Sequence, residues 1–100
     1  MYKDLLNKKV LVRSYDAGVY FGTLTKVEGE TVRMENVRNI WHWTGASCLS
    51  QIANDGIKGD KVSPVVGSMV IIRVCQILTL TDKAIENLEA QPVWKISVIE

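Results

Sequence analysis

A chain of 100 residues with 47% hydrophobic side chains is expected to form a single domain over residues 1–100. A domain of this size buries only about 60 to 65% of its unfolded surface, so we expect a modest core and apolar surface left over for a partner. Twelve basic and eleven acidic side chains give a net charge of +1. Because this charge provides no overall attraction to phosphate backbones or anionic lipids, general nucleic-acid or membrane binding is not expected.

The cysteines and the apolar runs favour a cytoplasmic location. Cys48 and Cys75 are far apart and form no CxxC pair, and the polar residues 1–9 lack the apolar stretch of a secretory signal. The longest apolar run, residues 69–80, is interrupted by Arg73 and is too short to span a bilayer as a helix. We therefore expect a cytoplasmic protein without a transmembrane span.

The first 43 residues predict three antiparallel strands. Residues 8–15 and 19–27 are rich in β-branched and aromatic side chains and flank turn residues at 16–18. A second tight turn leads to residues 31–43, where apolar and polar side chains begin to alternate. Gly22 lies inside the second strand, and a glycine there predicts a bulge or a bend. These three strands are expected to form a curved meander.

Two short helices are predicted after the meander. Thr44 can cap a helix that stops at Gly56, and Thr81 can cap a second helix that ends at Pro92. Each helix has one apolar face, which is expected to point into the core. The predicted inward-facing residues are Ala46, Leu49, Ile52 and Ala53 in the first helix and Ala84, Ile85 and Leu88 in the second.

Two further strands complete the predicted fold. Residues 69–80 are apolar on both faces, so this strand is expected to be covered on both sides. In residues 93–100 apolar and polar side chains alternate, which predicts a last strand that closes the sheet or is exchanged with a partner. We therefore expect a mainly β protein of the α+β class: a small curved antiparallel sheet, or an SH3-like or Sm-like barrel, of about five strands with two short helices.

Catalytic and metal-binding functions have little support in the sequence. The chain holds one histidine, His42, and no HExxH, GxSxG or P-loop motif. Cys48 and His42 could form a thiolate–imidazole pair. A small buried cysteine on the first turn of a helix is the commoner arrangement. Zinc ligands are too few and too scattered, so we expect no enzyme, no metal and no cofactor.

A candidate anion site lies around residues 44–47, which read TGAS. Their small side chains would leave the N–H groups of the predicted helix start accessible, and such groups attract phosphate. Arg38 lies just upstream, and Arg33 and Arg73 also lie in predicted strands. The planar guanidinium suits phosphate or carboxylate recognition.

Two tryptophans flank the histidine. Trp41 and Trp43 share one face of the predicted strand and could stack a base, while His42 faces the other side. The alternatives are that the tryptophans anchor the core or a subunit interface and that His42 is an ordinary polar residue. The strand arginines could instead pair with Glu28, Glu30 and Glu35. The candidate ligand-binding residues are Arg33, Arg38, Trp41, His42, Trp43, Thr44, Gly45, Ala46, Ser47 and Arg73.

The chain resembles a group of short bacteriophage-encoded proteins of unassigned function that carry an R-x-[IL]-W-x-W-x-G-A signature and a late tryptophan. The matching residues are Arg38, Ile40, Trp41, Trp43, Gly45, Ala46 and Trp94. Small phage proteins of this kind include host-takeover and counter-defence factors, among them symmetric oligomers that sequester cyclic-nucleotide immune signals. The resemblance therefore implies a homo-oligomer in the host cytoplasm.

Two hypotheses for the function follow. The first is a non-enzymatic, homo-oligomeric sponge that sequesters a cyclic nucleotide or another phosphate-bearing small molecule as a counter-defence factor. The second is a structural or protein-interaction module, either a virion component or an inhibitor of a host protein. In the second hypothesis the tryptophans and the two-sided strand at residues 69–80 form the interface.

Overall fold

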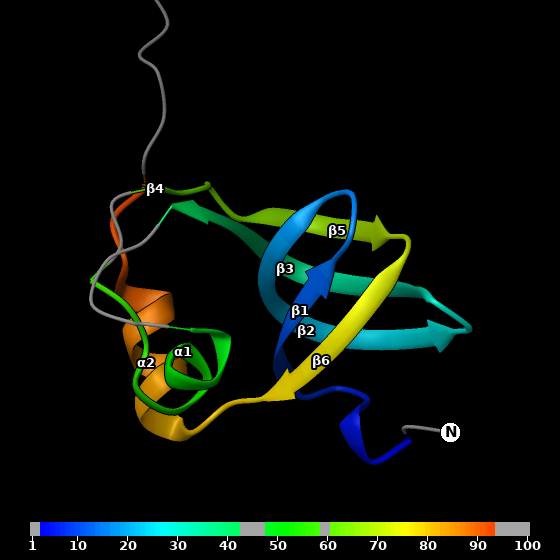
Figure 1. Cartoon of the computed structure of the whole chain (residues 1–100), viewed down its shortest axis with the longest axis horizontal. Helices are drawn as coiled ribbons and strands as arrows, with labels where there is room; N and C mark the ends of the chain where they lie inside the picture. Colours follow the sequence, from blue (N-terminus) through cyan, green and yellow to red (C-terminus); the bar gives the residue numbers. More distant parts are fainter. Residues whose placement is uncertain (1–2, 43–47, 59–60, 94–100) are drawn as a thin grey trace, which may run out of the picture.

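The structure is a computed structural model that describes residues 3–42, 48–58 and 61–93. This part of the chain contains one antiparallel sheet, a short 3₁₀ turn and two α-helices (Figure 1). The strands are β1 (Lys9–Ser14), β2 (Gly18–Glu28), β3 (Thr31–His42), β4 (Lys61–Val62), β5 (Val66–Ile71) and β6 (Val74–Thr79). The helical elements are η1 (Lys3–Leu5), α1 (Leu49–Asp55) and α2 (Asp82–Ala90). The predicted mainly β, α+β class is confirmed.

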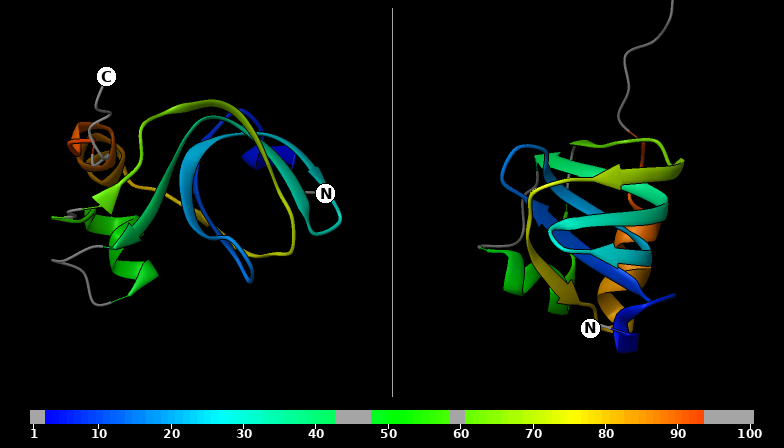
Figure 2. Two further views of the ribbon diagram at one scale, coloured as in Figure 1. Left: turned by 90° about the horizontal axis from the view of Figure 1, so that it is seen from above. Right: turned by 90° about the vertical axis from the view of Figure 1, so that its right-hand side faces the viewer.

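The strands follow the order β4–β3–β2–β1–β6 across the sheet, and β5 also pairs with β3. β4 pairs with the end of β3, whereas β5 pairs with residues 32–37 of β3, on the side away from β2. Figure 2 shows that this open sheet is strongly curved. The strands at its two edges, β5 and β6, follow each other through a two-residue corner at Ile72 and Arg73. The predicted curved antiparallel sheet is therefore confirmed.

A bulge at Gly22 contributes to this curvature. The register between β2 and β3 shifts between Phe21 and Thr23, as the glycine in the second strand predicts. A Cβ atom on Gly22 would lie 3.1 Å from the carbonyl oxygen of Glu35, so the two strands approach closely here. Bulges bend a strand and increase its twist.

Apolar side chains form two clusters, one on each face of the sheet. The outer cluster includes Ile52 of α1 and Leu88 of α2 and so lies between the sheet and the helices, whereas the inner cluster consists of strand residues on the other face. Figure 2 shows both helices outside the curve of the sheet. The inner cluster contains Val10, Val12, Leu24, Val32, Met34, Val37 and Ile71. The outer cluster contains Leu11, Val19, Phe21, Ile40, Ile52, Ile57, Val62 and Leu88.

The strand that is buried on both faces is β1. Its residues Val10 and Val12 belong to the inner cluster, Leu11 belongs to the outer cluster, and all three are fully buried. The expectation that residues 69–80 form one doubly covered strand is wrong. That stretch is divided at Arg73, whose φ of 54° lies in the left-handed region and ends the extended conformation.

The helices match the predictions at three of their four ends. α1 ends at Gly56, which has a φ of 84°, and α2 begins after Thr81, whose hydroxyl oxygen accepts a hydrogen bond from the Ala84 N–H at 3.1 Å. α2 also ends just before Pro92, at Ala90.

The predicted start of the first helix at Thr44 is wrong, because α1 begins at Leu49 with Cys48 at the N-cap. Ile52 and Ala53 point into the core as predicted, whereas Ala46 lies outside the described residues. Among the described residues, no helix is both long enough and apolar enough to cross a membrane.

A candidate interaction surface along strand β5

β5 is an edge strand with one side unoccupied. It pairs with β3 from Val32 opposite Ile71 to Val37 opposite Val66, and no strand in the described ranges pairs with its other side. In an antiparallel edge strand, every second residue directs its N–H and C=O groups away from the sheet. Figure 1 shows β5 alongside β3 in the upper part of the sheet. The outer edge of β5 can therefore accept an added strand.

The outward-facing side chains of β5 and of the corner that follows it are mostly apolar and exposed. Val66 is 42% exposed, Val70 is 53% exposed and Ile72 is 56% exposed, and Met69 and Ile71 alternate with them and turn inward. No charged residue occurs in the sequence from position 62 to position 72. Natural edge strands usually carry a lysine or another charge that prevents pairing with a second chain. β5 lacks this protection.

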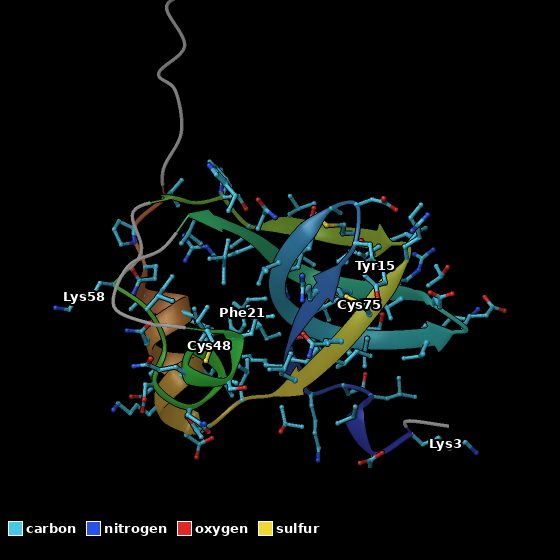
Figure 3. The ribbon with its side chains drawn as sticks, in the orientation of Figure 1. Lys3, Tyr15, Phe21, Cys48, Lys58 and Cys75 are labelled. Carbon is cyan, nitrogen blue, oxygen red and sulfur yellow. The ribbon has the colours of Figure 1, made fainter. Side chains whose placement is uncertain are left out.

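An aromatic and a cationic side chain extend this row at the corner after β5. Tyr15, labelled in Figure 3, is 68% exposed, and the guanidinium carbon of Arg73 lies 5.9 Å from the centre of its ring. Arg73 Nε also forms an ion pair with Asp16 Oδ2 at 2.8 Å. The corner is fixed by Ser14, whose hydroxyl donates to the carbonyl oxygen of Ile72 at 2.7 Å. Tyrosine and arginine are enriched in the energetic centres of interfaces.

Polar side chains border the apolar row on the neighbouring strand. Arg33 and Glu35 of β3 lie opposite Val70 and Ser68 of β5. A shallow hollow of about 170 Å³ lies between β2, β3 and Val70. An apolar centre with a polar border is the usual organisation of a protein interface. We call Val66, Val70, Ile72, Tyr15 and Arg73 together the β5 surface.

Arg38, the central residue of the predicted anion site, has a structural position. It is only 4% exposed, and its Nε donates to the carbonyl of Ser63 at 2.9 Å. Its Nη1 donates to the carbonyl of Leu88 at 3.0 Å, and its Nη2 donates to the carbonyl of Pro92 at 3.4 Å. Burial lowers the pKa of Arg38 from its usual value, although arginine stays protonated at neutral pH. The expectation that Arg38 holds phosphate is therefore corrected: it joins β3 to two distant segments.

The other predicted ligand-binding residues are dispersed. Trp41 is exposed and His42 is the last residue of β3. Arg33 lies beside the β5 surface, opposite Val70, and Arg73 is part of that surface. The residues that lie outside the described part of the chain are Trp43, Thr44, Gly45, Ala46 and Ser47. Because α1 starts at Leu49, the amides at its beginning are not those of the predicted anion site. Nucleotide binding stays a prediction.

Ion pairs and cysteines also differ from the expectations. The ion pairs in the described ranges join Lys9 to Glu89, Arg73 to Asp16 and Lys83 to Asp55, so the expected pairs of the strand arginines with Glu28, Glu30 and Glu35 are not formed there. Cys48 is exposed rather than buried. Within the same ranges, no three His, Cys, Asp or Glu side chains are grouped so that they could hold a metal ion.

The sequence points to part of the β5 surface: Arg73 is a predicted ligand-binding residue, and Val70 and Ile72 lie in residues 69–80, the interface of the second hypothesis. Val66 and Tyr15 are not among the predicted site residues. The signal in the sequence that indicates an exposed strand here is the uncharged stretch at residues 62–72. This stretch overlaps the apolar run at residues 69–80. Nothing in the sequence indicates that Tyr15 joins the β5 surface, because its position depends on the contact between the first hairpin and the corner at Arg73.

Comparison with known proteins identifies the family but no activity. Neither the curated proteins nor the solved structures contain a match to this chain. One family model matches residues 7–88, a range that contains α1, the whole β5 surface and the six strands of the described residues. The chain therefore belongs to the family described as Domain of unknown function (DUF6948).

Proposed function

We propose that this protein is a non-catalytic protein-interaction module that associates with a second copy of itself through the outer edge of β5. Of the two hypotheses that the sequence raises, this develops the second and keeps the homo-oligomer of the first. The observation that carries the proposal is an edge strand whose outward side chains Val66 and Val70 are apolar and exposed. Strand addition supplies main-chain hydrogen bonds, and the exposed side chains supply apolar contact.

A second copy fits this edge because β5 is uncharged. Two copies that approach through the stretch at residues 62–72 bring no like charges together. Most soluble oligomers are symmetric assemblies of identical chains, in which one surface patch serves both subunits. Arg73 and Asp16, which have opposite charges, lie at the end of the row and can satisfy each other without a partner.

The edge by itself provides a weak interface. Covering a half-exposed valine or isoleucine contributes about 1 kcal/mol. Val66, Val70 and Ile72 of each copy, six side chains in the dimer, therefore contribute about 6 kcal/mol. Association costs about 4 to 15 kcal/mol in lost translational and rotational freedom. We therefore expect association that depends strongly on concentration unless further surface is buried.

A charge placed on the outer edge of β5 tests the proposal. Val70→Lys is expected to shift the protein to a monomer, because a lysine on the edge opposes strand pairing. Gln76→Lys is the matched control, since Gln76 is also exposed but lies on β6, at the opposite edge of the sheet. The measurement is sedimentation equilibrium over a range of concentrations. If both variants self-associate as strongly as the wild type does, the proposal is overturned.

A further inference from the structure

The described chain ends beside the beginning of β5. The guanidinium of Arg38 donates to the carbonyl of Ser63, shortly before β5, and to the carbonyl of Pro92, near the end of the described chain. One side chain therefore holds both segments together. Figure 1 shows the end of the described chain next to β4, from which the chain leads into β5. The described chain therefore ends next to the segment that leads into β5.

The sequence that follows has the pattern of a strand. In residues 94–98, WKISV, apolar and polar side chains alternate, and aromatic and β-branched residues favour the extended conformation. A strand rises about 3.3 Å per residue, so residues 94–99, here called the tail segment, match the length of β5, which is also six residues long. The tail segment has the length and the pattern of a strand that could occupy the free edge of β5.

The direction of the tail segment decides which β5 it can pair with. The described chain ends near the N-terminal end of its own β5, so a tail segment running along that strand would make a parallel pair. Every strand pair in the described sheet is antiparallel, and parallel pairing is slightly less stable per residue. The tail segment becomes antiparallel when it runs along the β5 of a second copy that points in the opposite direction.

We infer that the tail segment of a second copy adds to the outer edge of β5 as an antiparallel strand, and that the two copies exchange these strands reciprocally. This inference rests on the proposed function and names the part of the partner that fills the edge. The two added strands lie between the two β5 strands and pair with each other, which gives one continuous antiparallel sheet across the dimer. The additional strands supply the contact area that the β5 edge lacks by itself.

Disulfide trapping between two different variants tests the exchange. Cys48 and Cys75 are first replaced by serine, so that the introduced cysteines are the only thiols. A Val70→Cys chain is then mixed with an Ile96→Cys chain under oxidising conditions. The expected product is a covalent dimer that contains one copy of each variant. A Gln76→Cys chain in place of Val70→Cys is the control and is expected to give little of this product, because Gln76 lies on the opposite edge strand.

The trapping experiment also separates exchange from pairing within one chain. Because the register is not fixed in advance, Val66→Cys and Ser68→Cys are tested beside Val70→Cys. A chain that carries a β5 cysteine together with Ile96→Cys is expected to form dimers. If it closes an internal disulfide and stays monomeric, the tail segment pairs with its own β5 and the exchange is overturned. If no β5 position gives the mixed dimer, the inference is overturned as well.

Removal of the tail segment distinguishes the inference from the proposed function. Deletion of residues 94–100, and separately Ile96→Pro in the full chain, are expected to raise the dimer Kd at least about tenfold. Circular dichroism checks that both variants stay folded. If association is unchanged by both while Val70→Lys abolishes it, β5 remains the contact strand and the tail segment is not its occupant. If Val70→Lys also has no effect, the proposed function fails together with the inference.

Discussion

β1 and β5 are strands of equal length in the same sheet, and both are rich in valine. β1 lies between β2 and β6, where the inner cluster covers one face and the outer cluster covers the other. β5 lies at the edge, and only its inward side chains are covered. The same residue type therefore serves two purposes: valine in β1 stabilises the fold, whereas valine on the outer face of β5 is available to a partner.

This contrast explains how a small protein can keep apolar residues on its surface without losing its own core. A buried valine contributes to folding through the water it leaves and the contacts it gains. A valine that stays half exposed contributes little to the stability of the single chain. Its contribution appears only when another chain covers it. The predictions below compare substitutions in covered and uncovered positions, in order of decreasing effect on stability.

Arg38→Met is expected to have the largest effect, with a loss of about 3 kcal/mol or more in the free energy of unfolding. The substitution removes the donors for the carbonyls of Ser63, Leu88 and Pro92. The bond to Leu88 is buried, and a buried acceptor that loses its partner is costly. Denaturant unfolding measures the loss. Arg33→Met, at an exposed position of the same strand, is expected to change stability by less than about 0.5 kcal/mol. Equal effects of the two substitutions would refute the structural role of Arg38.

The same substitution in β1 and β5 tests the comparison itself. Val12→Ala is expected to cost about 2 to 3 kcal/mol, because Val12 is fully buried and the change leaves a cavity. Val70→Ala is expected to cost less than about 0.5 kcal/mol when measured at a concentration where the protein is monomeric. Thermal or denaturant unfolding of both variants provides the values. A large loss for Val70→Ala in the monomer would mean that β5 is part of the core.

Alanine substitutions at two glycines are expected to change the free energy of unfolding by smaller amounts, with a loss at one position and none at the other. Gly56→Ala is expected to cost about 1 to 3 kcal/mol, because Gly56 has a φ of 84° and a Cβ atom there would collide with the side chain of Asn87. Gly67→Ala in β5 is expected to be neutral or slightly stabilising, since a Cβ atom there meets nothing within 4 Å. The free energy of unfolding of the two variants checks this. A reversed order would contradict the described packing between α1 and α2.

Much of the fold could be predicted because local patterns determine it. Gly22 marks a bulge, Thr81 caps α2 and Gly56 stops α1, and each of these features depends on neighbours in the sequence or on one strand partner. The β-branched stretches at residues 8–15 and 19–27 likewise predict their own conformation, since their side chains favour a pleated surface.

Features that depend on distant segments could not be predicted. Residues 69–80 carry no signal for the corner at Arg73, because arginine does not favour a positive φ and the corner is fixed by Ser14 and Tyr15 of the first hairpin. Arg38 looks like a ligand-binding residue in the sequence, since nothing there indicates that three carbonyls from the segment before β5 and from the α2 end converge on it. The start of α1 at Leu49 also differs from the capping pattern at Thr44.

Amide hydrogen exchange of β1 and β5, measured at low and at high protein concentration, tests the central claim most directly. The account predicts that the amides of β1 are strongly protected at both concentrations, because β1 has strands on both sides. The β5 amides whose N–H groups point away from β3 are expected to exchange quickly at low concentration. They are expected to become protected at high concentration, when a second chain pairs with them. Fast exchange of the outward β5 amides at every concentration would contradict the claim that β5 is the contact strand between copies.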